Sequence, residues 1–176
     1  GVDTHEVIRT GMIGGMEGAM IEGIFHGDLH GGNLFVRPDG RTVLMDFGIT
    51  GRVAPGIREV LRDLLPAIIV DRDFERVVDG LFEIGAATGP IDRVTAAADL
   101  DALVTPLLSR AIGDIVFGEL LDQVLRVATR HRIRLPRELV LVVKQLLYFE
   151  RYAKAIAPDH QILADPALLA LLRRAS

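Results

Sequence analysis

Three oxygen-bearing side chains stand close together in a short, glycine-rich part of the sequence. Asp28 precedes Asn33 by five residues, and Asp46 follows Asn33 by thirteen residues. Carboxylate and amide oxygens are ligands that Mg²⁺ prefers, and a carboxylate can orient a hydroxyl group for attack on a phosphate. The spacing therefore predicts phosphoryl transfer, with Asp28 as the catalytic base or orienting group and with Asn33 and Asp46 as metal ligands. The expected cofactors are ATP and Mg²⁺ or Mn²⁺.

The residues around these side chains follow the pattern of a phosphotransferase. His26, Asp28 and Asn33 fit the order H-x-D-x-x-x-x-N, and Asp46 opens the D-F-G triplet that follows this order in protein kinases. Gly48 is predicted to contribute to cofactor binding, because a glycine lets the backbone approach a phosphate closely. Each element alone is common in ordinary turns. Their order, their spacing and the hairpin between them together favour a phosphotransferase.

His26 and His30 admit two interpretations. Imidazoles beside carboxylates can bind a metal such as zinc, which would make the chain a metal-binding helical protein. Alternatively, both histidines are structural residues near the site, and the ring of His26 braces the segment that carries Asp46. The glycines at 27, 31 and 32 predict a loop rather than a helix that would present both rings on one face. We therefore expect the structural role.

The pattern of apolar residues predicts a mainly α fold with a small β-hairpin. Residues 1–24 are expected to hold one helix, from about residue 4, and residues 25–52 the catalytic loop, a hairpin with strands at 33–36 and 42–45, and the D-F-G segment. Residues 55–176 are expected to form a helical bundle. Its predicted helices span 56–70, 74–84, 98–112, 119–131, 137–156 and 166–174, with N-caps at Asp73, Asp99 and Asp165 and interruptions at Pro66 and Pro106.

Three methionines lie on one face of the first predicted helix: Met12, Met16 and Met20. Methionine adapts to irregular contacts, and this helix is also rich in glycine. One expectation is that the face is exposed, because chain outside this sequence packs on it. The alternative is that the face is buried against the helices that follow Pro55.

Composition excludes several classes of protein. The 176 residues carry 20 Lys and Arg against 24 Asp and Glu, a formal net charge of −4, which gives no support to a nucleic-acid partner. The absence of cysteine excludes disulfides, thiolate metal sites and a cysteine nucleophile. No secretory leader and no apolar run long enough to span a membrane is visible. We expect a cytoplasmic location, peripheral to a membrane if attached to one.

The segment from Phe25 to Val36 resembles the catalytic loop of the UbiB/AarF atypical kinases, which reads close to F-H-A-D-x-H-P-G-N followed by three apolar residues. His30 is the position that separates this family from ordinary protein kinases. The segment from Met45 to Arg52 is similar to the family's D-F-G-x-x-G-R, and the segment from Leu135 to Lys144 to its L-P-x-E helix. The resemblance spans nearly the whole chain.

The same loop often begins with the run found here at residues 26–30, His-Gly-Asp-Leu-His, in aminoglycoside- and choline-kinase-like phosphotransferases. That group is the alternative family, and the residues from Arg134 to Tyr152 favour UbiB/AarF over it. A non-catalytic, kinase-like binding module is a further alternative. The intact set of Asp28, Asn33 and Asp46 argues for an enzyme.

The resemblance implies a single protein-kinase-like C-terminal lobe over residues 1–176 that acts as an ATP- and Mg²⁺-dependent phosphotransferase or ATPase. It also implies a link to isoprenoid-quinone (ubiquinone-type) biosynthesis and work at a membrane or lipid surface. The family's N-terminal motifs have no counterpart in this sequence: an Ala-rich nucleotide loop, a nucleotide-contacting Lys and a Lys-x-Gly-Gln helix. We therefore expect the N-terminal lobe to be missing here, and the lobe alone to be inactive.

Overall fold

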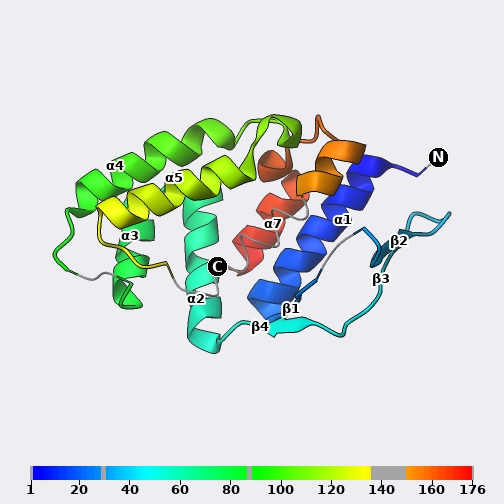
Figure 1. Cartoon of the computed structure of the whole chain (residues 1–176), viewed down its shortest axis with the longest axis horizontal. Coiled ribbons are helices and arrows are strands. Elements are labelled where there is room, and N and C mark those ends of the chain that lie inside the picture. The colour runs from blue at the N-terminus through cyan, green and yellow to red at the C-terminus, as the bar shows by residue number, and fades with distance from the viewer. Residues whose placement is uncertain (1, 29–30, 87–88, 136–149, 176) are drawn as a thin grey trace.

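Helices make up most of this computed structural model, which describes residues 2–28, 31–86, 89–135 and 150–175 (Figure 1). The helices and helical turns are, in chain order, α1 (Thr4–Glu17) with a π-helical turn (Gly18–Glu22), α2 (Pro55–Pro66) with a second π-helical turn (Ala67–Asp71), α3 (Phe74–Glu83), α4 (Arg93–Val104), 3₁₀ turns at Thr105–Leu107 and Ile112–Asp114, α5 (Phe117–Arg130), residues 150–156, a 3₁₀ turn at Ile162–Ala164 and α7 (Pro166–Ala175). The predicted mainly α fold is confirmed.

The first helix is capped by Asp3, and its π-helical turn ends two residues before Ile24, where the first strand begins. The side chain of Asp3 accepts hydrogen bonds from the backbone N–H groups of His5, at 3.0 Å, and Glu6, at 3.3 Å. The helix widens into its π-helical turn at Gly18, where a Cβ atom would lie 2.8 Å from the carbonyl oxygen of Ile24. Gly23 then ends the helix at φ +70°.

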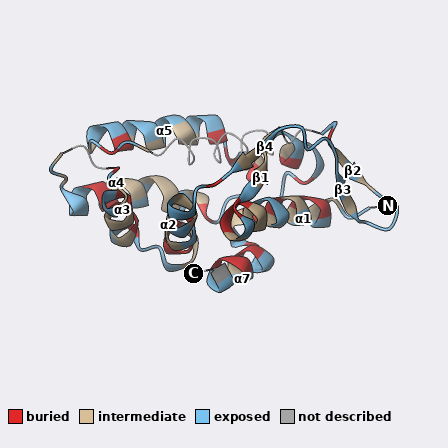
Figure 2. Cartoon of the chain, turned by 90° about the horizontal axis from the view of Figure 1, so that it is seen from below, coloured by how far each residue is buried: buried red, intermediate tan, exposed pale blue. Residues whose placement is uncertain are grey.

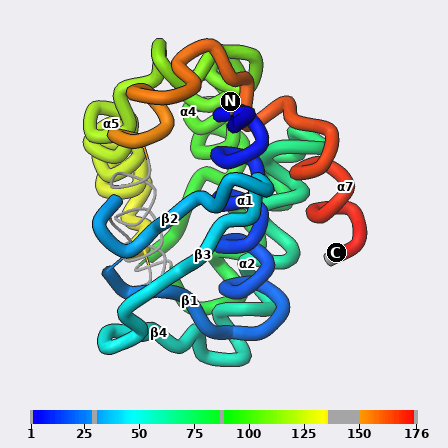
Figure 3. The backbone as a smooth tube through the Cα atoms, turned by 90° about the vertical axis from the view of Figure 1, so that its right-hand side faces the viewer, coloured from blue at the N-terminus to red at the C-terminus, as the bar shows by residue number. Residues whose placement is uncertain are grey.

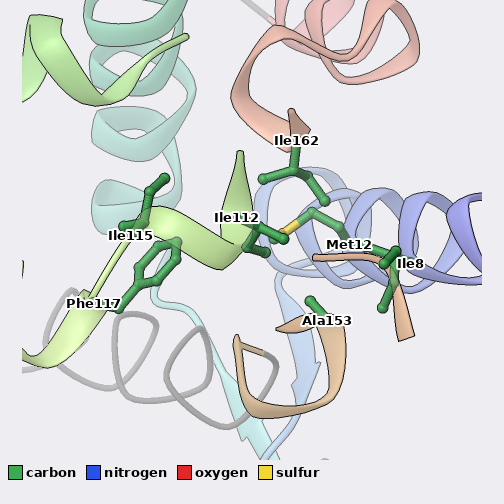
Figure 4. Packing of buried hydrophobic residues seen from close by; sticks show 8 residues of the cluster. Ile8, Met12, Ile112, Ile115, Phe117, Ala153 and Ile162 are labelled. Atoms are coloured by element: carbon green, nitrogen blue, oxygen red, sulfur yellow. The ribbon is translucent and has the colours of Figure 1, made fainter. Parts of the chain in front are cut away.

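The methionine face of α1 is buried, so the expectation of an exposed face is wrong. Met12 is 7% exposed and Met20 is 1% exposed. Met12 packs with Ile112 and Ile162 (Figure 4), whereas Met20 packs with residues of α2 and α7. Met16 is partly buried and contacts both clusters. The later helices therefore cover this face, as the alternative expectation has it.

Two antiparallel ribbons follow α1, one nested inside the other. Strands β2 (Leu34–Val36) and β3 (Thr42–Leu44) form the predicted hairpin, in which Phe35 lies opposite Val43. Strands β1 (Ile24–His26) and β4 (Thr50–Arg52) form a second ribbon that the sequence analysis did not predict. Figure 3 shows both ribbons on the same side of the molecule, with β3 passing across α1, which it contacts. The β1–β4 ribbon thereby brings together the two ends of the segment that carries the predicted site.

The helices after the ribbons pack in sequence, α2 on α3, α3 on α4 and α4 on α5, while α7 returns to α1 and α2 (Figure 1). Asp73 caps α3 by accepting a hydrogen bond from the N–H of Arg76, and Asp165 accepts one from the N–H of Ala167 at the start of α7. Both predicted caps are confirmed. Pro66 and Pro106 stand where α2 gives way to a π-helical turn and where α4 gives way to a 3₁₀ turn, as expected.

The predicted start of the fourth helix at residue 98, with Asp99 as its cap, is wrong. Asp92 caps α4, because its carboxylate accepts hydrogen bonds from the N–H and the hydroxyl of Thr95. Asp99 lies inside the helix, where it pairs with Arg130 at 2.9 Å and His131 at 2.8 Å. The predicted helix 137–156 lies partly outside the described residues, and its described part, residues 150–156, is helical.

No helix in the described parts of the chain is both long enough and apolar enough to cross a membrane.

A partly buried polar cluster ties α1 to the start of α7. Asp165, 3% exposed, accepts a hydrogen bond of 2.8 Å from Arg9 Nε, and its second neighbour is His160, 8% exposed, whose Nε2 lies 3.2 Å from the carboxylate. His160 also meets the ring of His5, Nδ1 to Nδ1, at 3.2 Å, and His5 lies 3.4 Å from Asp159. Burial lowers the pKa of His160, against the attraction of the Asp165 carboxylate.

We predict that this cluster makes stability depend on pH near neutrality. The folded state binds a proton on His160 less readily than the unfolded chain, whose histidine pKa is about 6.5. The free energy of unfolding should therefore be greatest above that pH and fall as the pH is lowered through it toward the folded-state pKa. Urea unfolding from about pH 7.5 to 5.5 measures this slope. In His160→Gln the slope should flatten; an unchanged slope would contradict the assignment.

Candidate active site

The predicted site has two halves, the loop that begins at Asp28 and the segment of Met45 and Asp46. His26 joins these halves through both of its ring nitrogens. Its Nδ1 accepts a hydrogen bond of 3.2 Å from the N–H of Asp28, and its Nε2 lies 3.0 Å from the carbonyl oxygen of Met45, the residue before Asp46. A backbone N–H only donates and a carbonyl only accepts, so the ring must be neutral with its proton on Nε2. The ring of Phe47 lies beside it, 5.3 Å between centroids. The structural role predicted for His26 therefore has a physical basis.

Asn33 is the buried member of the predicted site, with 7% exposure. Its side-chain nitrogen donates a hydrogen bond of 3.2 Å to the carbonyl oxygen of Asp28, which closes the loop between them. Its backbone carbonyl accepts a hydrogen bond of 2.8 Å from the N–H of Met45. Because the amide nitrogen makes the contact with Asp28, the amide oxygen is the atom that remains suited to a metal.

Asp46 stands in an uncommon backbone conformation. Its φ is +56°, in the left-handed region that Asp and Asn enter more readily than most residues. The carboxylate oxygen Oδ1 accepts a hydrogen bond of 3.2 Å from the N–H of Gly48, and a Cβ atom on Gly48 would lie 3.0 Å from that oxygen. A side chain at position 48 would therefore crowd the carboxylate that the sequence assigns to the metal.

The β1–β4 ribbon fixes the distance between the two halves. His26 lies opposite Thr50, and the N–H of Gly27 donates a hydrogen bond of 2.8 Å to the carbonyl oxygen of Ile49. A Cβ atom on Gly27 would lie 2.7 Å from Cγ2 of Ile49, so a larger residue here would have to displace that side chain. Sequence reasoning missed this ribbon, and three-residue strands with Gly51 at the centre of one leave little alternating pattern to detect.

The backbone contacts bring the segments of Asp28, Asn33 and Asp46 together, and the carboxylates of Asp28 and Asp46 are exposed to solvent. The two expected metal ligands, the amide of Asn33 and the carboxylate of Asp46, are hard oxygen donors that fit Mg²⁺ or Mn²⁺. Within the described ranges, no group of three or more His, Cys, Asp or Glu side chains could hold a metal. His30 lies outside the described residues. The joint ligation of one ion by Asn33 and Asp46 stays a prediction.

The segment that carries the site contains several large apolar side chains that are exposed. In Figure 2 the β2–β3 end of the molecule is coloured exposed or intermediate, whereas α1 and α7 each carry a buried face. The exposed fractions reach 60% at Phe47 and 59% at Ile49. We call these exposed residues of the ribbons and the D-F-G segment the apolar band: Ile24, Phe35, Val43, Leu44, Met45, Phe47 and Ile49. Exposed apolar side chains that gather in one part of a chain are candidates for an interface.

Comparison with known families gives two matches that follow one another along the chain. Residues 1–81 match the ABC1 atypical kinase-like domain, and residues 100–161 match the UbiB helical domain. The first match contains the whole of the candidate site. The second contains α5, the C-terminal part of α4 and helix 150–156.

Individual relatives agree with these matches. The chain is 40% identical over 168 residues to an uncharacterised protein of Mycobacterium tuberculosis, a match that covers 96% of this chain and 34% of the relative. It is 29% identical over 164 residues to an uncharacterised aarF domain-containing protein kinase of Arabidopsis thaliana, described as chloroplastic, with 80% of this chain and 30% of the relative covered.

The chain thus spans about a third of the length of these relatives. No solved structure matches it. The kinase-like and helical domain matches, together with the relatives named for the aarF domain, agree with the loop and D-F-G residues described above. The chain belongs to the UbiB/AarF family of atypical kinase-like proteins.

Proposed function

We propose that residues 1–176 form the C-terminal, catalytic lobe of an ATP- and Mg²⁺-dependent phosphotransferase or ATPase. The observation that carries the proposal is the double hydrogen bond of His26, which holds the Asp28 loop against the segment of Met45 and Asp46. Phosphoryl transfer needs a carboxylate for the nucleophile and oxygen ligands for the metal, all fixed in advance. A loop held in place for another reason would not need all three of these side chains.

The proposed roles follow from the position of each group. Asp28 orients or deprotonates the attacking hydroxyl or water. Asn33 and Asp46 hold Mg²⁺, which when bound neutralises charge on the phosphates. Gly48 keeps the backbone beside Asp46 narrow enough for a phosphate to approach. The neutral ring of His26 keeps Asp28 and Asp46 at a constant separation.

We further propose that a nucleotide-binding lobe outside these residues covers the apolar band. The relatives are about three times as long as this chain, so that they have room for such a lobe. The band borders Asp46, and its cover would exclude water from the site, which strengthens electrostatic interactions there. From the family resemblance alone, we also propose a place in isoprenoid-quinone biosynthesis, a peripheral location at a membrane surface and no nucleic-acid partner.

The two aspartates should fail in different ways when each is changed to Asn in the whole protein. Asp46→Asn should weaken binding of Mg²⁺-nucleotide, with partial rescue by raised Mg²⁺, and Asn tolerates the left-handed backbone at this position. Asp28→Asn should lower kcat by about 10²–10⁴-fold with nearly normal nucleotide affinity. Titration calorimetry and steady-state kinetics separate the two effects. Full activity in both variants would refute the catalytic assignment.

His26→Phe should disconnect the two halves while preserving the size of the ring. It removes two hydrogen bonds, so we expect a loss of about 1–3 kcal/mol in the free energy of unfolding, together with a large loss of turnover. Thr50→Ala is the matched control, because Thr50 is an exposed residue opposite His26 in the same ribbon, and it should change stability by about 0.5 kcal/mol or less. Urea unfolding and turnover assays measure both. Equal effects of the two substitutions would argue against the bracing role.

Residues 1–176 alone should bind ATP weakly and show negligible turnover. They contain the proposed metal ligands but not the lysine and glycine-rich cover that normally hold the phosphates. Calorimetric titration with ATP and Mg²⁺ checks this, with the whole protein as the reference. Equally tight binding by both would show that no additional lobe is needed.

A further inference from the structure

The glycine-rich loop rests against the ring of Tyr152, a residue far away in the sequence. A Cβ atom on Gly31 would lie 2.5 Å from Cε1 and 3.0 Å from Cζ of Tyr152. Carbon atoms that are not bonded do not approach so closely, so any residue larger than glycine would have to displace the ring or the loop. The contact joins the segment matched by the kinase-like domain to the segment matched by the UbiB helical domain.

Tyr152 is held from the other side by the core. The next residue, Ala153, is fully buried, and one turn later Ala157 is 1% exposed; both belong to the buried cluster that contains Ile8 of α1. Figure 4 shows Ala153 in this cluster. The N–H of Ala157 donates a hydrogen bond of 2.8 Å to the carbonyl of Ala153, so the helix continues through this point. The backbone of Tyr152 therefore cannot shift without opening the core beneath it, so the 37% exposed ring projects toward Gly31 from a fixed backbone.

The supported turn lies between the two ends of the catalytic loop. Gly31 stands two residues before Asn33, whose side chain donates to the carbonyl oxygen of Asp28. A displacement at Gly31 thus acts on both ends of this hydrogen bond. The Asp28 N–H is already fixed by His26, so the ring of Tyr152 supplies a second, independent constraint on the same loop.

We propose that Tyr152 is a positioning residue for phosphoryl transfer, whose ring sets the place of the Gly31 turn and thereby the relation of Asp28 to Asn33. This inference rests on the proposed function. In this proposal the helix at residues 150–156 supports the catalytic loop through the ring of Tyr152.

The test compares four variants of the whole protein with Mg²⁺-ATP as the probe. Tyr152→Ala and Gly31→Ala should each lower kcat, because a misplacement of about 1 Å can cost about 10²-fold in rate. KM for the nucleotide should change less than kcat, because Asp46, one of the two proposed metal ligands, keeps its place. Tyr152→Phe keeps the ring and should restore most of kcat. Ile156→Ala is the matched control: its side chain is 41% exposed on the same helix, close to the 37% of Tyr152, and it should leave kcat unchanged.

The double variant Gly31→Ala/Tyr152→Ala tests whether the two single substitutions act through the same contact. The methyl group at position 31 displaces the ring, so adding the second substitution should cost little more than either one alone. Independent losses that multiply would overturn the proposal. So would a wild-type kcat in Tyr152→Ala, or a loss of kcat in Tyr152→Phe as large as in Tyr152→Ala.

Hydrogen exchange of the backbone amides of residues 27–33 gives a readout that does not depend on turnover. These amides should exchange faster in Tyr152→Ala than in the unmodified protein or in Ile156→Ala, and equal exchange in all three would overturn the proposal. A wild-type protein without phosphotransferase or ATPase turnover, in which the exchange of Tyr152→Ala is nevertheless faster, would overturn the proposed function and leave the support of the loop established.

Discussion

The hydrogen bonds of His26 are the constraint on which the arrangement of the site depends. One ring nitrogen accepts from the N–H of Asp28 and the other donates to the carbonyl of Met45. A single neutral imidazole thus bridges two segments that the β2–β3 hairpin separates in sequence. A protonated ring could not accept from Asp28, and the opposite tautomer would place a donor against a donor. One chemical state of one side chain is therefore compatible with the whole arrangement.

The hydrogen bonds of His26 can hold the site in place only because the strand that carries His26 is itself firmly anchored. The strand that carries His26 follows directly from α1, whose end is secured by the buried Met20 and by a hydrogen bond of 3.0 Å from Arg58 of α2 to the carbonyl of Ile21. The N–H of Val53 donates to the carbonyl of Gly23 at 2.9 Å, so the return strand is held at the same place. Movement of the site would require movement of α1 against α2, which the core opposes.

The features that could be predicted from the sequence are those that depend on interactions between residues close together in the chain. The hairpin, the order of Asp28, Asn33 and Asp46, and the caps at Asp73 and Asp165 all depend on residues near one another in the chain. The β1–β4 ribbon, the burial of Met12 and Met20 and the support of Gly31 by Tyr152 depend on distant partners, which no short pattern contains. The start of α4 was misplaced for a related reason: Asp99 fits a cap by composition, but the carboxylate of Asp92 satisfies the first turn and leaves Asp99 to Arg130.

The positive φ of Asp46 is not explained by the way the chain folds around it. Three described residues other than glycine have positive φ: Asp46, Arg72 and Arg132. Arg72 ends the π-helical turn after α2, and Arg132 comes just after α5, so both belong to the left-handed ends that helices commonly adopt. Asp46 ends no helix. Glycine would adopt this conformation without strain, yet the position carries a carboxylate, and strained backbone of this kind concentrates at functional sites. The side chain at position 46 is therefore better explained by chemistry than by stability.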